Sequence, residues 1–298
     1  MNKLPKIYIS PINEPILNAM ICFGDRVGII MSKRQYGYDG GYVKQEIIKK
    51  AFDTDAVLER DHFCMKKISL GEIEFEARTF DIIHIDPWYL NDYKISAPVE
   101  WIKIFLEYND EIKFELGTED FIQILEVKDY ETILKKLGKK SSSIEYLVCQ
   151  GGSVVFNLQN ISPIDTEKTK AFIELGRKLG IKIKRHNCDF HTNEDLNLLV
   201  DLGVDAFNFA PEFTYISNKV ILENLTSEDK LLFINKIRKT APWQRWLDDD
   251  KDENMLILAC AHYLDNDLVM EKYISKFSSE IESKICDRIE ELCRIIYK

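Results

Sequence analysis

The feature that most limits the fold of this chain is a repeated pattern in which a short apolar run precedes a stretch with helical periodicity. Eight apolar runs end in polar residues, at positions 6–10, 27–32, 56–61, 81–86, 112–117, 144–150, 181–186 and 205–210. Helical stretches lie between most of them, for example at 42–52, 128–137, 166–179 and 193–202. This alternation is typical of a parallel sheet, and eight units predict an α/β fold of the closed (β/α)8 TIM-barrel type. A doubly wound open sheet is the alternative, because periodicity does not determine closure.

The pattern changes after Glu212 to amphipathic helices, at 216–237, 255–277 and 281–297. We therefore predict a barrel over residues 1–240 and a helical C-terminal extension over 241–298, packed on the barrel or on a partner subunit. The extension carries an apolar stripe that needs a covering surface, namely Leu256, Leu264, Leu268 and Tyr273. A homo-oligomer is therefore expected, with packing of the stripe on the chain's own barrel as the alternative.

Charge and cysteine content indicate a small-molecule ligand and a reducing compartment. The chain has 40 Lys and Arg against 50 Asp and Glu, and this net charge of -10 disfavours nucleic acid or an anionic membrane as the main partner. Its seven cysteines are scattered, which indicates neither a disulfide framework nor a thiolate zinc site. We find no signal-peptide pattern and no run near the ~20 apolar residues of a membrane span, so a cytoplasmic location is expected.

Polar residues concentrate where the predicted strands end. In a barrel these ends share one face, the C-terminal mouth, where barrel enzymes keep their chemistry. The candidate substrate-binding residues at these ends are Arg34, Gln35, Arg60, His84, Gln150, Arg185, Asn187 and Asn208. The arginines among them suit a phosphorylated or carboxylated sugar. The alternative is that these side chains only solvate the strand ends.

Two histidines at separate strand ends predict a metal site. His62 and His186 can meet at the barrel axis, and Glu115 can complete a set of three ligands with an open position, as in catalytic zinc sites. Structural, hydrogen-bonded histidines are the alternative. Asp61 and Asp86 are candidates to move a proton or to orient an imidazole, although Asp86 also suits a cap on the turn at Pro87. His262 lies in the helical extension, where a structural role is favoured.

Several familiar chemistries are disfavoured. The pairs Gly40-Gly41 and Gly151-Gly152 lie in neither of the usual nucleotide-binding glycine motifs, so tight turns are the preferred interpretation. We find no G-x-S-x-G elbow and no cysteine in a nucleophile motif, which disfavours acyl transfer.

The order of these motifs resembles the class II ketose-bisphosphate aldolase superfamily, most closely its Z-type subunits of tagatose-bisphosphate aldolase, usually described as non-catalytic. The resemblance spans most of the barrel. The segments that carry it are 32–43, Asp61-His62, His84-Ile85-Asp86, the run from Glu115 to Asp120, His186, and 205–212.

The resemblance implies a barrel, a divalent metal such as zinc or manganese held by His62, Glu115 and His186, and Asp61 near the reacting carbon. The chain departs from the catalytic members after the sixth strand, where Gln150 is followed by Gly151 and no histidine occurs. Our first hypothesis is a metal-dependent, aldolase-like lyase or epimerase that acts on a sugar phosphate or sugar acid through an enediolate, with Asp61 or Glu212 moving the proton. The second is a non-catalytic subunit that supports assembly of an aldolase-like partner.

Overall fold

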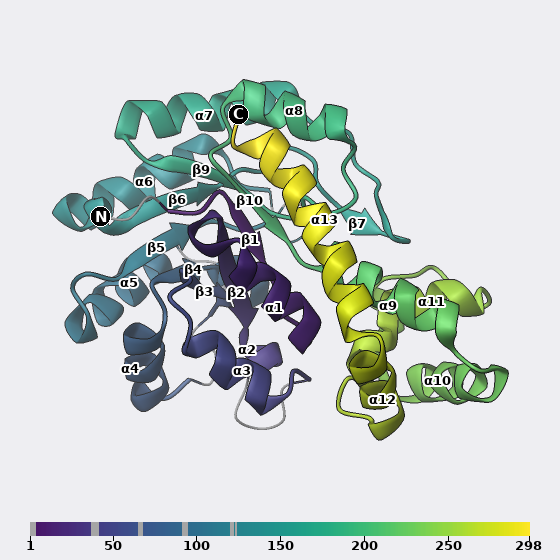
Figure 1. Ribbon diagram of the computed structural model, residues 1–298. Coiled ribbons are helices and arrows are strands. Elements are labelled where there is room, and N and C mark those ends of the chain that lie inside the picture. The colour runs from purple at the N-terminus through teal and green to yellow at the C-terminus, as the bar shows by residue number, and fades with distance from the viewer. Residues whose placement is uncertain (1–3, 37–41, 65–67, 91–94, 120–121, 123) are drawn as a thin grey trace.

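The computed structural model describes residues 4–36, 42–64, 68–90, 95–119, 122 and 124–298, and its centre is a closed barrel of eight parallel strands. The strands are β1 (Ile7–Ile9), β2 (Val27–Ser32), β3 (Leu58–Phe63), β4 (Ile82–Ile85), β5 (Lys113–Leu116), β6 (Ile144–Val148), β9 (Lys182–Arg185) and β10 (Ala206–Phe209). β10 pairs with β1, with Ile7 opposite Phe207, which closes the ring (Figure 1). The predicted TIM barrel is confirmed, and the open sheet is excluded.

Helices cover the outside of the barrel. They are α1 (Glu14–Cys22), α2 (Lys33–Tyr36), α3 (Gln45–Phe52), α4 (Leu70–Thr79), α5 (Ser96–Tyr108), α6 (Val127–Leu137), α7 (Thr166–Leu179), α8 (Asn193–Leu202) and α9 (Pro211–Asn224). Local sequence explains several of their ends. Ser69 and Thr192 form capping boxes, and Gly180 and Gly203 end α7 and α8 in the left-handed conformation.

The two-residue period of a strand decides which side chains enter the barrel. On β3, Glu59 and Asp61 face the interior, and on β9 Lys184 does so, since the Lys184 ammonium contacts Glu59. The alternate residues, Arg60 and Arg185, are buried on the outer side, against α4 and α7. This alternation determines which side chains of β3 and β9 face the interior of the barrel and can reach its C-terminal mouth.

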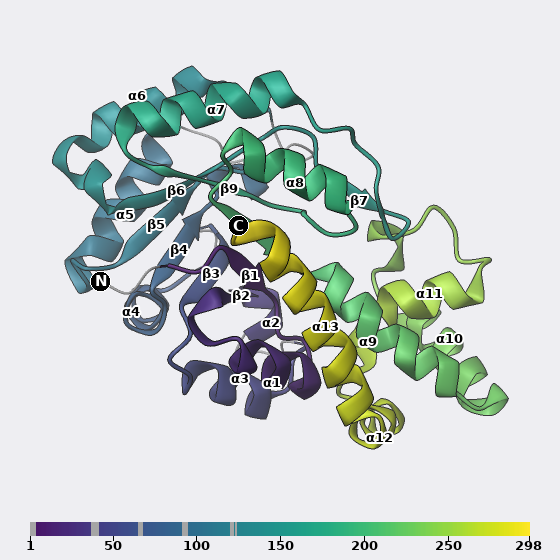
Figure 2. The ribbon, with the colours of Figure 1, turned by 45° about the horizontal axis from the view of Figure 1, so that its top comes forward.

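A small hairpin follows β6 and extends toward the C-terminal extension, as Figure 2 shows. It consists of β7 (Val155–Phe156) and β8 (Gln159–Asn160), joined by Asn157 and Leu158, both at positive φ. The Asn157 backbone amide donates to the Trp246 carbonyl at 2.8 Å, and its side-chain amide donates to Asp248 at 2.7 Å. The hairpin therefore connects the barrel to the extension above the mouth.

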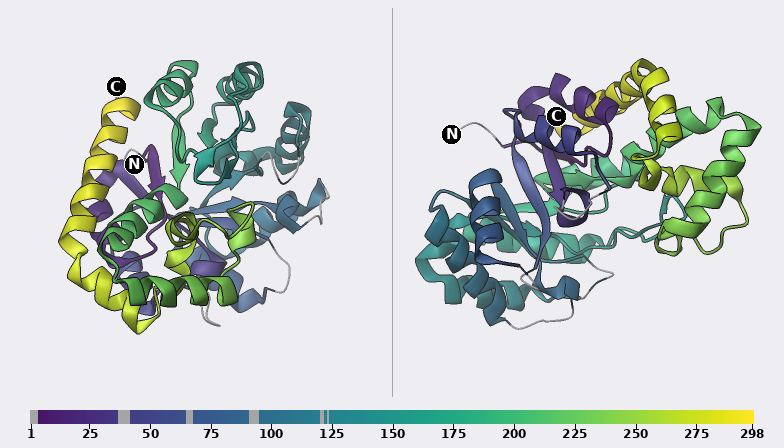
Figure 3. Two further views of the ribbon diagram at one scale, coloured as in Figure 1. Left: turned by 90° about the vertical axis from the view of Figure 1, so that its right-hand side faces the viewer. Right: turned by 90° about the horizontal axis from the view of Figure 1, so that it is seen from below.

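The extension contains α10 (Ser227–Thr240), a 3-10 turn at Trp243–Arg245, α11 (Glu253–Cys260), α12 (Leu268–Lys276) and α13 (Ser278–Ile296). Figure 3 shows α10 to α12 projecting from one end of the barrel. The helix predicted over 255–277 is divided into α11 and α12, because Asp267 caps a new helix. Leu256, Leu264 and Tyr273 are buried as predicted, but Leu268 is 82% exposed, which corrects its place in the stripe.

The last helix, α13, returns along the barrel and packs against α1 (Figure 1). Its buried face consists of Ile281, Ile285, Ile289 and Leu292. Next to its end, the Tyr297 hydroxyl accepts from the Lys6 amide at 2.7 Å and donates to the Arg26 carbonyl at 2.6 Å. This part of the extension is thus covered by the chain's own barrel, while the domain division at residue 240 stays a prediction. No helix among the described residues is long and apolar enough to span a membrane.

Candidate active site at the barrel mouth

A cavity of about 450 Å³ lies at the C-terminal mouth of the barrel. Its floor includes strand-end residues, among them Asp61, His62, Glu119, His186 and Asn208. Val154, Val155 and Phe156 line it from the hairpin, and Pro242, Arg245, Trp246 and Tyr263 line it from the extension. Some of the polar strand ends therefore meet at the mouth, and the extension forms part of the wall.

His62 is held in a fixed orientation at the end of β3. It has a φ of 51°, a conformation that is uncommon for residues other than glycine and is frequent at functional sites. Its Nδ1 lies 2.8 Å from Asp86 Oδ2, while its Nε2 lies 3.4 Å from Glu119 Oε1 and 3.7 Å from Asp61 Oδ2. Asp86 is fully buried, so the Asp86 carboxylate orients the ring from behind and leaves Nε2 toward the other carboxylates.

His186 lies across the mouth from His62, with 6.0 Å between the ring centroids. Its Nδ1 lies 3.3 Å from Glu119 Oε1. Its Nε2 contacts Glu115 Oε1 and lies 3.0 Å from the Asn208 side-chain nitrogen. Glu119 therefore lies between the two histidines, whereas Glu115 is behind His186.

His84 positions the turn that carries Asp61 and His62. Its Nδ1 accepts the His62 backbone N–H at 3.2 Å and lies 3.2 Å from Asp61 Oδ1, and its Nε2 donates to the Gly117 carbonyl at 3.0 Å. The ring is fully buried and does not line the cavity. Its contacts are those of an orienting residue.

A charged layer lies beneath these residues inside the barrel. The Lys184 ammonium contacts Glu59, lies 2.9 Å from Glu115 Oε2, and is 3.6 Å from the centroid of the Tyr8 ring. All four side chains are fully buried. The Lys184 ammonium is thus the positive charge between the carboxylates of Glu59 and Glu115.

The electric field of the mouth favours charged carboxylates and imidazolium. Burial alone raises the pKa of Asp61, but the charge of His62 and the contact with the His84 ring hold that pKa well below its usual range. Burial alone lowers the pKa of His186, but Glu115 and Glu119 raise it to about 10. The pKa of His62 is likewise raised well above its usual value by Asp61 and Glu119, against the effect of burial. Such a concentration of negative charge attracts a divalent cation, which would displace these protons.

The residues present fit a metal ion. Ligand atoms of Asp61, His62, His84 and His186 lie within 4.8 Å of one another. Imidazole nitrogen with carboxylate oxygen is a donor set that zinc and manganese accept. Ligand atoms of Glu59, Glu115 and His186 also lie within 4.8 Å of one another. The Lys184 ammonium, however, already compensates the negative charge of these two carboxylates.

Other predicted site residues divide into two groups. Arg34, Gln35, Asn187 and Asn208 line the cavity. The rest do not line it, and their contacts are internal. Arg60 pairs with Glu76 at 3.1 Å, Arg185 donates to the Gly151 and Gly152 carbonyls, Gln150 bridges Thr118 and Leu125, and Glu212 pairs with Arg288 of α13 at 2.8 Å.

The structure adds residues that the sequence analysis did not assign to the site. Glu119 lies only four positions after Glu115 in a glutamate-rich turn, so a signal was present. Arg245, Trp246 and Tyr263 lie in the extension, where nothing in the local sequence links them to the barrel mouth. Residues 37–41, which include Gly40-Gly41, lie outside the described residues.

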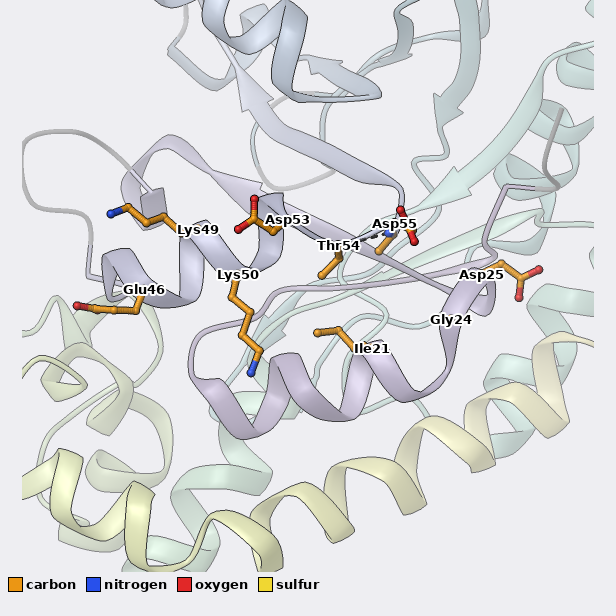
Figure 4. A pocket seen from close by; sticks show the side chains of 10 residues that line it. Ile21, Gly24, Asp25, Glu46, Lys49, Lys50, Asp53, Thr54 and Asp55 are labelled. Carbon is orange, nitrogen blue, oxygen red and sulfur yellow. Dashed lines mark hydrogen bonds between the residues drawn. The ribbon is translucent and has the colours of Figure 1, made fainter.

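A larger cavity of about 890 Å³ lies at the opposite, N-terminal end of the barrel, between α1 and α3. Figure 4 shows that the labelled charged side chains there, such as Glu46, Lys49 and Asp25, point in different directions. That end of a TIM barrel serves stability. The polar side chains that converge on one cavity are therefore those at the C-terminal mouth.

No protein-family model and no curated protein matches this sequence, whereas solved structures match almost the whole chain. The structures named below are described as a sugar-acid epimerase, a sugar-phosphate kinase and an aldolase, and at identities of 9–15% the likeness shows a shared fold. The fructuronate-tagaturonate epimerase UxaE of Cohnella laeviribosi has a TM-score of 0.68 at 10% identity, over 99% of this chain and 82% of the epimerase.

Two further solved structures share the fold. A protein described as a probable tagatose 6 phosphate kinase from Sinorhizobium meliloti 1021 has a TM-score of 0.65 at 15% identity, over 97% of this chain and 87% of that protein. The fructose-bisphosphate aldolase of Campylobacter jejuni has a TM-score of 0.59 at 14% identity, over 99% of this chain and 92% of the aldolase. The likeness concerns the barrel and its helical extension together.

Proposed function

We propose that this protein is a metal-dependent, aldolase-like lyase or epimerase that acts on a sugar phosphate or a sugar acid. The observation that carries the proposal is the arrangement of His62, His186 and Asp61 around the floor of one cavity. The fold shared with an aldolase and a sugar-acid epimerase supports the substrate class.

Each residue of the floor has a distinct task in this proposal. His62 and His186 hold the ion, and a bound divalent ion supplies a Lewis acid that polarises a substrate carbonyl. Asp61 moves the proton at the carbon beside that carbonyl, because its carboxylate is ionised and partly exposed. His84 and Asp86 keep Asp61 and His62 in place.

The cavity also has the means to bind an anionic group. Arg34 and Arg245 line it from β2–α2 and from the extension, and neither has a carboxylate partner among the described residues. Tyr42 and Tyr263 lie beside them, with 5.2 Å between the ring centroids. Two exposed guanidiniums over one cavity in an acidic protein suit a phosphate or carboxylate.

Metal analysis combined with ligand binding tests the proposal. We expect about one divalent ion per chain, none after His62 and His186 are both replaced by alanine, and a higher melting temperature with sugar phosphates or sugar acids.

Asp61→Asn should retain the metal and lose turnover by about 100-fold or more, as expected for a group that transfers a proton. Arg245→Gln should weaken binding of the anionic sugar and leave metal content unchanged. A native protein that takes up no metal when offered zinc and manganese would refute the enzyme and favour an assembly subunit.

We further propose a cytoplasmic location. All seven cysteines are free thiols in the structure, which agrees with a reducing compartment.

A further inference from the structure

We propose that Glu119, rather than Glu115, is the carboxylate that binds the metal together with His62 and His186. This inference rests on the proposed function, because it identifies the third ligand of the same site. Glu119 lines the cavity and is 8% exposed, whereas Glu115 is fully buried and does not line it.

The distances around Glu119 differ from those of hydrogen bonds between charged groups. Its Oε1 lies 3.4 Å from His62 Nε2 and 3.3 Å from His186 Nδ1. A charge-assisted N–H···O bond is shorter, about 2.7–2.9 Å, and the same His62 ring makes one at 2.8 Å to Asp86. Ligands at about 2.0–2.1 Å from a tetrahedral zinc ion lie roughly 3.3 Å from one another. Each separation from Glu119, taken by itself, matches the spacing of two ligands of one ion, although Glu119 is outside the group of Asp61, His62, His84 and His186 whose ligand atoms all lie within 4.8 Å of one another.

Glu115 is unsuited to direct ligation. Its Oε2 lies 2.9 Å from the Lys184 ammonium, and its Oε1 contacts His186 Nε2. A positive charge at that distance already compensates the carboxylate and repels a second cation. Lys184 is fully buried between Glu59 and Glu115, so it has no room to move to solvent.

The outer contacts of the two histidines agree with this assignment. A metal-binding histidine commonly offers its second ring nitrogen to a carboxylate, which fixes the ring and increases its basicity. His62 has Asp86 in that position on Nδ1, and His186 has Glu115 in that position on Nε2. The nitrogen left on each ring is the one that lies near Glu119.

The turn after β5 explains how Glu119 reaches the site. Gly117 has a φ of 141°, and a Cβ there would lie 2.6 Å from the Tyr130 hydroxyl and 2.7 Å from Val148 Cβ. Only glycine fits this position, and the sharp turn brings the chain back over the mouth. Glu115 therefore lies deeper in the barrel, and Glu119 lies above it at the cavity.

Cobalt binding distinguishes Glu119 from Glu115 as the metal ligand. The full-length protein is first freed of metal with a chelator and then titrated with cobalt. We expect Glu119→Gln to lower cobalt affinity by more than about 100-fold and to change the d–d absorption spectrum, because a ligand is lost. Glu115→Gln should lower affinity by only about 10–100-fold, as is usual for an outer contact, with an unchanged spectrum. Glu107→Gln, an exposed change on α5, is the matched control and should have no effect. Circular dichroism melting checks that each variant is folded.

Glu119→Asp provides a second variant if Glu119→Gln does not fold. It keeps a carboxylate on a shorter chain, so weaker binding with a spectrum of the native type is expected. Native affinity and spectrum in the folded Glu119 variants, or loss of the ion in Glu115→Gln alone, would overturn the assignment while the enzyme proposal stands. A wild-type chain that binds no cobalt would contradict both the assignment of Glu119 and the proposed metal-dependent enzyme.

Discussion

At the scale of single residues, position along a strand decides between the cavity and the outer wall. Three consecutive residues of the β9 region illustrate this. Lys184 and His186 point into the barrel, while Arg185 between them is bound by Ser153 and Thr169 on the other side. Arg60 is excluded from the mouth for the same reason, since Asp61 next to it faces inward. A strand-end position alone was therefore insufficient evidence for substrate binding.

The buried charge of Lys184 should be essential for stability. Lys184→Met leaves Glu59 and Glu115 without their cation, and we expect a loss of about 3–5 kcal/mol in the free energy of unfolding, as for other broken buried ion pairs. Adding Glu59→Gln should restore part of it. Lys182→Met is the control on the same strand, because the Lys182 pair with Glu145 is exposed and should contribute less than about 1 kcal/mol. Equal losses in the two lysine variants, measured by urea unfolding, would contradict this account.

His262 should make the protein sensitive to acid. Burial lowers the pKa of His262 to about 3, and its Nδ1 has no hydrogen-bond partner among the residues that the structure describes. A histidine with a depressed pKa stabilises the fold above about pH 6.5, its unfolded value, and that stability is lost as the pH falls toward 3. At pH 5 the loss amounts to about 2 kcal/mol, given about 1.4 kcal/mol per pH unit.

His262→Phe keeps a ring next to Tyr263, whose ring centroid lies 4.1 Å from that of His262, and it removes the titration. We therefore expect the variant to lose less stability than the wild type between pH 7 and pH 5 in chemical unfolding experiments. The same pH dependence in both proteins would show that other groups dominate.

At the scale of elements, α13 is the part of the extension that the barrel needs. Four of its side chains, Ile281, Ile285, Ile289 and Leu292, are fully buried. Each contributes about 1.5–3 kcal/mol on burial, so their joint contribution is comparable with the whole stability of a typical domain, about 5–15 kcal/mol. We expect truncation after residue 277 to yield protein without a cooperative thermal transition. A truncated chain that melts within a few degrees of the full chain would show that α13 is dispensable.

The hairpin of β7 and β8 is the second element that couples the barrel to the extension. Asn157 makes its contacts with Trp246 and Asp248, and Asn160 donates to the Asn187 carbonyl at 2.9 Å beside the cavity. The hairpin thus contributes Phe156 to the cavity wall and contacts Trp246, which lines another part of the wall beside Arg245. Two elements that are distant in sequence form one binding surface.

At the scale of the whole molecule, part of the extension lacks a covering surface. Leu268 is 82% exposed and Leu231 of α10 is 58% exposed. We therefore keep the prediction of a homodimer or larger assembly, to be measured by light scattering at micromolar concentration. Leu231→Lys with Leu268→Lys should shift the species toward monomer and leave the melting temperature of the monomer unchanged. A wild-type chain that is strictly monomeric would contradict the prediction.

The sequence alone indicated eight strands with intervening helices, several of the helix ends and the general place of the site. Strand and helix periods and capping glycines are local signals, so a linear pattern contains them. It also indicated His62, His186 and Asp61, because each lies at or directly beside the end of a predicted strand.

Only the tertiary structure decided which side chains meet. The pairing of Glu119 with both histidines depends on the turn at Gly117, and the placement of Arg245 and Tyr263 over the mouth depends on how the extension packs. The burial of Lys184 between Glu59 and Glu115 likewise depends on barrel closure. These contacts join residues tens to more than a hundred positions apart, and no local pattern in the chain specifies which distant partner a side chain contacts.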